Sequence, residues 1–176
     1  MKITVSNIIV GNKATVKITT DSAFTGNVNV KIGSKNYAVN VVKGKGTAMI
    51  SGLKVGTYKA TATFVATETF KASTKTATFK VKAHVIKLTL KKVKVKRSAK
   101  KLTITAKLKI DGKVAKGKKL KFRFKNKKYT AKTNKKGISK IIIKKNVLKK
   151  LKVGKKVTYK ATYGKKTVKR TVMVRK

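Results

Sequence analysis

The stretch Leu53-Lys54-Val55-Gly56-Thr57-Tyr58-Lys59-Ala60-Thr61 decides the fold that this sequence predicts. A near copy returns as Leu151-Lys152-Val153-Gly154 and, after three inserted residues, Thr158-Tyr159-Lys160-Ala161-Thr162. Each copy places an apolar residue and a glycine turn just before a strand that opens with tyrosine. In β-sandwiches this arrangement forms a corner, where the tyrosine hydroxyl bonds back to the backbone. Two copies therefore predict two sandwich modules in tandem, with Tyr58 and Tyr159 as their corner residues.

Short runs of alternating apolar and polar residues surround both corners. The clearest are residues 14–19 (ATVKIT), 28–32 (VNVKI), 102–110 (LTITAKLKI) and 120–125 (LKFRFK). This period of two is typical of half-buried strands, and glycine- and asparagine-rich turn signals separate the runs. The chain is thus predicted to be all-β and to form two tandem immunoglobulin-like β-sandwich domains, residues 1–83 and 84–176.

Local patterns in the second module predict further details. Asp111-Gly112 is a strong tight-turn dipeptide, and Asn146 is placed to cap a short helical turn. The apolar positions of the two clearest strands are expected in the core. The residues predicted to be buried there are Leu102, Ile104, Phe122 and Phe124.

Charge is the extreme feature of the composition. The 176 residues include 50 Lys and Arg but only three Asp and Glu, which gives a formal net charge of +47 at pH 7. Residues 84–176 hold 37 of the basic residues and a single acid, Asp111. A chain of this charge repels itself and attracts polyanions. With no Cys there are no disulfides, and no apolar run approaches the ~20 residues of a transmembrane helix.

Candidate catalytic and metal-ligating residues are few and scattered. The three acids and the single histidine stand far apart in the sequence, whereas acid–base pairs and metal sites need such groups close together. Turn formation explains Asp21 and Asp111, Glu68 lies in an expected loop, and His84 lies in the junction between the modules. The sequence therefore predicts no catalytic residue, no metal site and no cofactor.

Several motifs resemble those of a known family. Ile3-Thr4-Val5-Ser6-Asn7-Ile8, the corner at residues 52–58 and Lys71-Ala72-Ser73-Thr74 resemble immunoglobulin-like repeats of adhesin-like surface proteins from methanogenic archaea. The second module is similar to the Lys-rich module near the C-terminus of such proteins, notably in residues 130–137, 147–154 and 163–170. The resemblance covers nearly the whole chain, but turns and corners specify a fold better than an activity. It implies a cell-surface stalk whose last module lies by the cell wall.

The resulting expectation is a non-enzymatic, extracellular adhesin or stalk held by its second module to an anionic cell-wall or envelope polymer. Since no secretory signal follows Met1, we expect the sequence to be a piece of a longer protein, whose upstream domains would contact a host or neighbouring cell. Outward basic residues on two strands are the candidate polyanion-binding residues: Lys101, Lys107, Lys109, Lys119, Lys121, Arg123 and Lys125.

A nucleic-acid-binding protein is the alternative that the total charge allows. It is not favoured, because only four of the 50 basic residues are Arg, which suits phosphate and guanine better than Lys does. The aromatic residues also occupy expected core positions, where they are unable to stack on bases.

Overall fold

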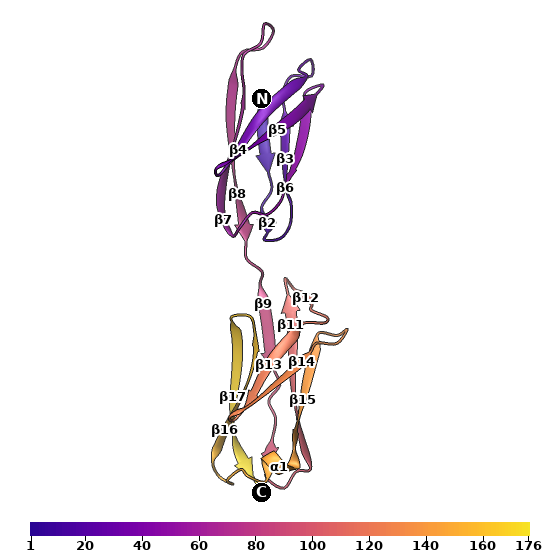
Figure 1. The fold of residues 1–176 in the computed structure, drawn as a ribbon, viewed down its shortest axis with the longest axis vertical. Helices are drawn as coiled ribbons and strands as arrows, with labels where there is room; N and C mark the ends of the chain where they lie inside the picture. The colour runs from indigo at the N-terminus through magenta and orange to yellow at the C-terminus, as the bar shows by residue number, and fades with distance from the viewer. The chain divides into compact units, whose positions relative to one another are not determined.

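The computed structural model describes residues 1–176, and Figure 1 shows its ribbon. The chain forms two compact units, Met1–His84 and Val85–Lys176. Nearly all regular structure is β-strand, and the exception is one helical turn, α1 (Lys145–Leu148). The predicted all-β class with sandwich domains is confirmed. A membrane-spanning helix needs far more than four residues, and no helix here meets that requirement.

The strands of the first unit form one continuous hydrogen-bonded sheet, which folds back on itself around a single core. The order along this path is β1-β3-β6-β5-β4-β7-β8-β2. β5 and β6 pair over only two residues each, which is the shortest antiparallel pairing in this sheet. β3 and β4 lie on either side of that pairing, and their buried residues belong to the same core. The strands are β1 (Lys2–Val5), β2 (Ile8–Ile9), β3 (Ala14–Thr19), β4 (Gly26–Ile32), β5 (Lys35–Val42), β6 (Lys45–Ile50), β7 (Gly56–Phe64) and β8 (Ser73–Lys82).

Alternation places one side of each strand of the first unit in its core. In β3 every second residue from Ala14 to Ile18 is buried. Phe24 lies in the segment between β3 and β4, yet its side chain is buried as well. Its ring packs against Phe64 and Phe70, with ring centroids 4.9 Å and 5.4 Å away. An aromatic cluster therefore extends this core beyond the alternating strands.

The second unit is a sandwich of two sheets (Figure 1). One has the strand order β10-β17-β16-β13-β14, and the other contains β12-β11-β15 with β9 paired to β11. A single core cluster draws residues from both sheets, as in β-sandwiches generally. The strands are β9 (Ile86–Leu90), β10 (Val95–Lys96), β11 (Lys101–Ile110), β12 (Lys113–Val114), β13 (Lys119–Phe124), β14 (Lys127–Lys132), β15 (Ile138–Lys144), β16 (Lys156–Tyr163) and β17 (Lys166–Arg175).

Strand β13 alternates as its sequence predicts. Phe122 and Phe124 are 2% and 0% exposed, whereas the basic residues between the apolar positions are exposed. Leu102 and Ile104 on β11 are buried as well. The four core residues predicted for this module are therefore confirmed.

The two local predictions beside these strands had opposite outcomes. Asp111 and Gly112 form the turn between β11 and β12 with φ values of 52° and 77°, as a type I′ hairpin requires, so this prediction is confirmed. The predicted cap by Asn146 is wrong. Lys144 occupies the N-cap position of α1 without a side-chain hydrogen bond, and Asn146 lies inside the helical turn.

The first tyrosine corner forms as its sequence predicts. The Tyr58 hydroxyl donates a hydrogen bond of 3.0 Å to the carbonyl oxygen of Lys54, four residues earlier in the turn. The Tyr58 ring is half-buried and stacks on Phe79, with ring centroids 5.6 Å apart. The corner therefore joins a turn to the strand that follows it.

The second corner corrects the prediction for Tyr159. Its hydroxyl donates to the carbonyl oxygen of Lys91 and accepts from the N–H of Val93, each at 3.0 Å, rather than bonding within its own corner. The side chain is 1% exposed. Residues 91–94 are the segment in which the chain leaves β9 in one sheet and reaches β10 in the other. Tyr159 therefore fastens a crossover between the sheets.

Candidate polyanion-binding faces

The seven predicted basic residues lie on two outer faces of the second unit. Because the sheets enclose the core between them, their outer faces point in opposite directions. The group on β11 comprises Lys101, Lys107 and Lys109. The group on β13 and directly after it comprises Lys119, Lys121, Arg123 and Lys125. The structure thus separates the candidate residues into two surfaces, and their role in binding a polyanion stays a prediction.

The outer face around β11 mixes basic and apolar side chains. Lys101 lies opposite Lys144 of β15, so two cations meet there. Nearby on β15, however, Ile142 is 56% exposed, and Val114 on β12 is 49% exposed. Positive charge on this face is therefore interrupted by apolar surface.

The outer face around β13 carries an unbroken line of cations across four strands. Arg123 lies opposite Lys128 of β14 on one side and opposite Lys160 of β16 on the other. Lys160 in turn lies opposite Lys169 of β17. We call these four residues the cation row. Neighbouring strands are ~4.8 Å apart, so the row runs about 14 Å straight across the sheet.

A shallow hollow adjoins the cation row. Its volume is about 560 Å³, and three members of the row, Arg123, Lys160 and Lys169, line it. The segment after α1 also lines it, through Lys150, Lys152 and Lys155. We call this space the basic hollow. Its remaining lining residues are Lys125, Asn126, Leu151, Lys156, Val157, Thr158 and Val174.

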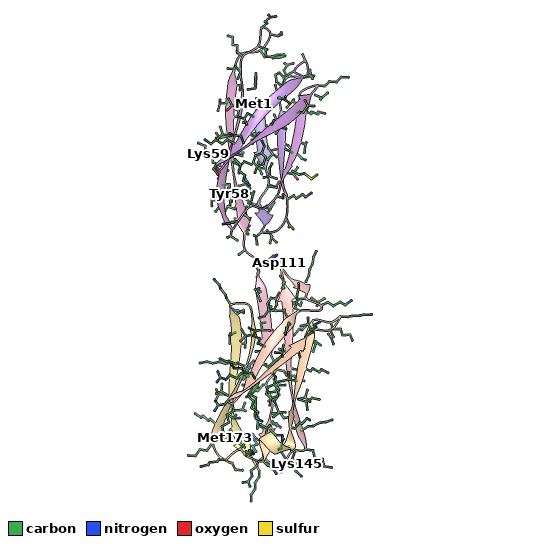
Figure 2. The ribbon with its side chains drawn as sticks, viewed as in Figure 1. Met1, Tyr58, Lys59, Asp111, Lys145 and Met173 are labelled. Atoms are coloured by element: carbon green, nitrogen blue, oxygen red, sulfur yellow. The ribbon has the colours of Figure 1, made fainter.

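The second unit offers almost no negative charge to balance these cations. Its one acidic side chain, Asp111, lies at the opposite end of the unit from Lys145 and Met173, as Figure 2 shows. The Asp111 carboxylate accepts a hydrogen bond of 2.8 Å from the N–H of Val85 and so serves the backbone. Burial raises the pKa of the Tyr129 hydroxyl, which therefore adds no negative charge beside the row at neutral pH.

Sequence reasoning missed the other members of this surface. Lys160 lies between Tyr159 and Ala161 on β16, and Lys169 is one residue from Val168 on β17, so the alternation could have placed both outward. What the sequence could not provide is the register, which aligns Lys128, Arg123, Lys160 and Lys169 although they span more than 40 residues of chain.

The acidic residues of the chain do not gather into a site. No group of three or more His, Cys, Asp and Glu side chains is placed to hold a metal ion. The Asp21 carboxylate accepts a hydrogen bond of 2.9 Å from the N–H of Ala23, which confirms its predicted role in a turn. Glu68 is exposed in the segment between β7 and β8.

No protein-family model matches the sequence, and no curated protein matches it. Solved structures of β repeat domains are similar over nearly the whole chain at low identity. The tetra-tandem repeat in the extending region of a large adhesion protein is 16% identical, with a TM-score of 0.43, over 97% of this chain and 48% of that one. The Ca²⁺-stabilized adhesin that helps an Antarctic bacterium reach out and bind ice is 13% identical, with a TM-score of 0.37, over 97% and 46%.

The chain thus spans about half the length of these two adhesin structures. Fibronectin(III)-like modules of CbhA from Clostridium thermocellum are 18% identical, with a TM-score of 0.39, over 99% of this chain and 94% of that one. A β-glucuronidase of Parabacteroides merdae is similar in the same way, with 10% identity and a TM-score of 0.33. Adhesins and an enzyme share these low scores, so the likenesses assign no ligand or activity to this chain.

Proposed function

We propose that this protein is a non-enzymatic cell-surface module whose second unit holds it to an anionic wall or envelope polymer. The observation that carries the proposal is the excess of positive charge on both outer faces of that unit, with one acidic side chain among its residues. In Figure 2 long side chains with nitrogen tips extend outward all around its strands. The cell-surface location rests on the resemblance of the sequence motifs to adhesin-like surface proteins.

Lysine suits attachment to an irregular polymer. Its ammonium group is a hydrated point charge on a flexible stem, so it follows charges whose positions vary along a chain. The strands hold the stems of Lys119 and Lys121 on a rigid sheet, while the charged ends remain in solvent. Counterions must gather on such a surface, and a bound polyanion would release them.

The distribution of acids supports a structural role over a catalytic one. Asp21 and Asp111 accept hydrogen bonds from backbone N–H groups, and Glu68 lies exposed in a loop of the first unit. General acid–base catalysis needs paired acid and base groups within reach of a common substrate, and the backbone contacts of Asp21 and Asp111 support structural roles instead.

Nucleic acid is the second candidate, because the charge that attracts a wall polymer also attracts phosphates. The aromatic residues weigh against it. Phe122, Phe124 and Tyr159 are buried in the second unit, so they are unable to stack on bases. The sandwich also lacks a helix long enough to enter a DNA groove.

The test compares the full chain with its first unit, residues 1–84, whose β-sheet circular dichroism is verified beforehand. Both are mixed with isolated cell walls of the source organism, and the bound fraction is measured across a salt series. We expect the full chain to bind at low salt and to be released at high salt, since the Debye length falls to ~3 Å at 1 M salt. The first unit should bind weakly, because its residues up to 84 carry 13 basic side chains and two acids. Equal binding by both would contradict the proposal.

A further inference from the structure

The cation row places four like charges side by side where the protein supplies nothing to neutralise them. Like charges directly opposite each other on adjacent strands are destabilising. The row contains three such pairs in succession, Lys128 with Arg123, Arg123 with Lys160 and Lys160 with Lys169. An anionic chain lying along the row would replace this repulsion with attraction.

The intervals between the cations of the row predict the intervals between negative charges on a chain that binds there. The four side chains originate at strand intervals of ~4.8 Å along a straight line. A linear polysaccharide of uronic acids carries one carboxylate on each sugar, and one sugar ring is about as long as the interval between strands. Four consecutive sugars thus match the length of the row, and the flexible lysine stems can reach carboxylates that point to different sides of the sugar chain.

Hydroxyl groups border the β16 and β17 half of the row on both sides. On β16, Thr158 and Thr162 flank Lys160, and on β17, Thr171 and Thr167 flank Lys169. The threonine oxygens lie 2.8 Å apart in the Thr158–Thr171 pair and 2.9 Å apart in the Thr162–Thr167 pair. Each pair retains hydrogen-bonding capacity for a neighbour, since a hydroxyl has one donor and two acceptor positions. In this half of the row the charges lie between hydroxyl groups, which matches a sugar chain that carries hydroxyls beside its carboxylates.

The basic hollow continues the same surface. Arg123, Lys160 and Lys169 belong to both the row and the hollow, so a bound chain passes from one to the other. The volume of about 560 Å³ lies within the usual ~300–1,000 Å³ of small-ligand sites. Lys150 and Lys152 line it as well. The hollow therefore has room for sugar units that lie beyond the end of the row.

From these features we infer that the cation row and the basic hollow form one binding site for an acidic polysaccharide with a carboxylate on each sugar. This site rests on the proposed function, and it narrows the partner from any anionic polymer to one class. It also assigns binding to the β13 face and not to the β11 face.

The test measures binding of the full chain to a fluorescent oligomer of ten galacturonic acids by anisotropy at low salt. The row variant combines Arg123→Gln, Lys128→Gln, Lys160→Gln and Lys169→Gln. The control variant removes the same number of charges from the opposite face. It combines Lys101→Gln, Lys107→Gln, Lys140→Gln and Lys144→Gln, all at exposed positions.

Each exposed ion pair is worth roughly a factor of two, so the row variant should bind roughly 10- to 20-fold more weakly. The control variant should bind less than about threefold more weakly, because the charges it removes lie on the opposite face and salt screens their attraction for the bound oligomer. The row variant should melt no lower than the parent, since it relieves repulsion, and circular dichroism checks this. Lys169→Gln alone, at an exposed position, should weaken binding about twofold and provides a minimal variant.

Three results would overturn the inference, and each has a different meaning. Equal losses in the row and control variants would show that binding is spread over the unit, which leaves the proposed function standing. Equal or tighter binding of a single-stranded DNA oligomer of the same charge, again weakened by the row variant, would keep the site and reject the polysaccharide. Failure of the parent to bind any of these polyanions at low salt would reject the proposed function itself.

Discussion

Replacing Tyr159 with Phe removes a single oxygen atom from the core of the second unit and leaves the ring in place. That oxygen makes two hydrogen bonds of 3.0 Å, to the carbonyl oxygen of Lys91 and from the N–H of Val93. Each bond contributes about 0.5–1.5 kcal/mol net, and a buried group left without a partner costs about 1–3 kcal/mol. Because Val93 is half-buried, we expect a loss of about 2–3 kcal/mol from the free energy of unfolding.

Tyr58→Phe is the matched control in the first unit. Its hydroxyl makes one hydrogen bond, to the exposed carbonyl oxygen of Lys54, and water takes its place after the substitution. This variant should lose only about 0.5–1 kcal/mol. The two tyrosines occupy equivalent places in the sequence pattern, so the difference between them measures the crossover contacts of Tyr159.

Differential scanning calorimetry of the full chain follows both units in one experiment. In a unit of this size, 1 kcal/mol shifts the melting temperature by about 4–8 °C, so Tyr159→Phe should lower the melting temperature of the second unit by about 10–20 °C. The unfolding transition of the first unit should remain unchanged. A loss no larger than that of Tyr58→Phe would refute the reasoning, because it would mean that the crossover does not depend on the hydroxyl.

Three further predictions concern packing, backbone and charge. Phe122→Ala should lower the free energy of unfolding in urea by about 3–5 kcal/mol, because the side chain is 2% exposed. An unchanged unfolding curve would mean that the opposite side of β13 faces the core. Gly154→Ala should cost about 1 kcal/mol for its positive φ of 76°. Gly137→Ala should cost at least twice as much, because its new Cβ would also lie 2.7 Å from the carbonyl oxygen of Leu108, and equal losses would contradict this. Raising NaCl from low to physiological concentration should raise the melting temperature of the second unit more than that of the first, because it screens self-repulsion, whereas equal shifts would exclude repulsion as the cause.

Local sequence patterns were sufficient for the elements whose partners are near in sequence or whose side chains face one core. The alternation of residues 120–125 predicts which side of β13 is buried, and Asp111-Gly112 predicts a hairpin turn that needs positive φ at both residues. In each case the information lies within a few residues. The first corner belongs to this class too, since Tyr58 bonds to a carbonyl only four residues away.

Such local patterns do not predict the contacts across the sandwich between residues that are far apart in the sequence. Tyr159 bonds to Lys91 and Val93, which lie 68 and 66 residues earlier. The three residues inserted before Thr158 distinguish the corner of Tyr159 from that of Tyr58, but they do not identify these distant partners. The cation row depends in the same way on the registers of three strand pairs. Individual outward lysines were predictable, but their alignment into one line arises from tertiary structure. The failed cap by Asn146 was a local misreading, since the helix begins one residue before it.

The place of Asp111 has a consequence for the behaviour of the protein in acid. Acid unfolding ordinarily comes from carboxylates that are paired in the native state and become protonated as the pH falls. The second unit has one acidic side chain, and that group serves the backbone N–H of Val85 at the beginning of the unit. Acidification therefore alters little else within this unit, and its net charge hardly changes. A polymer of acidic sugars would therefore leave this surface in acid only because its own carboxylates become protonated.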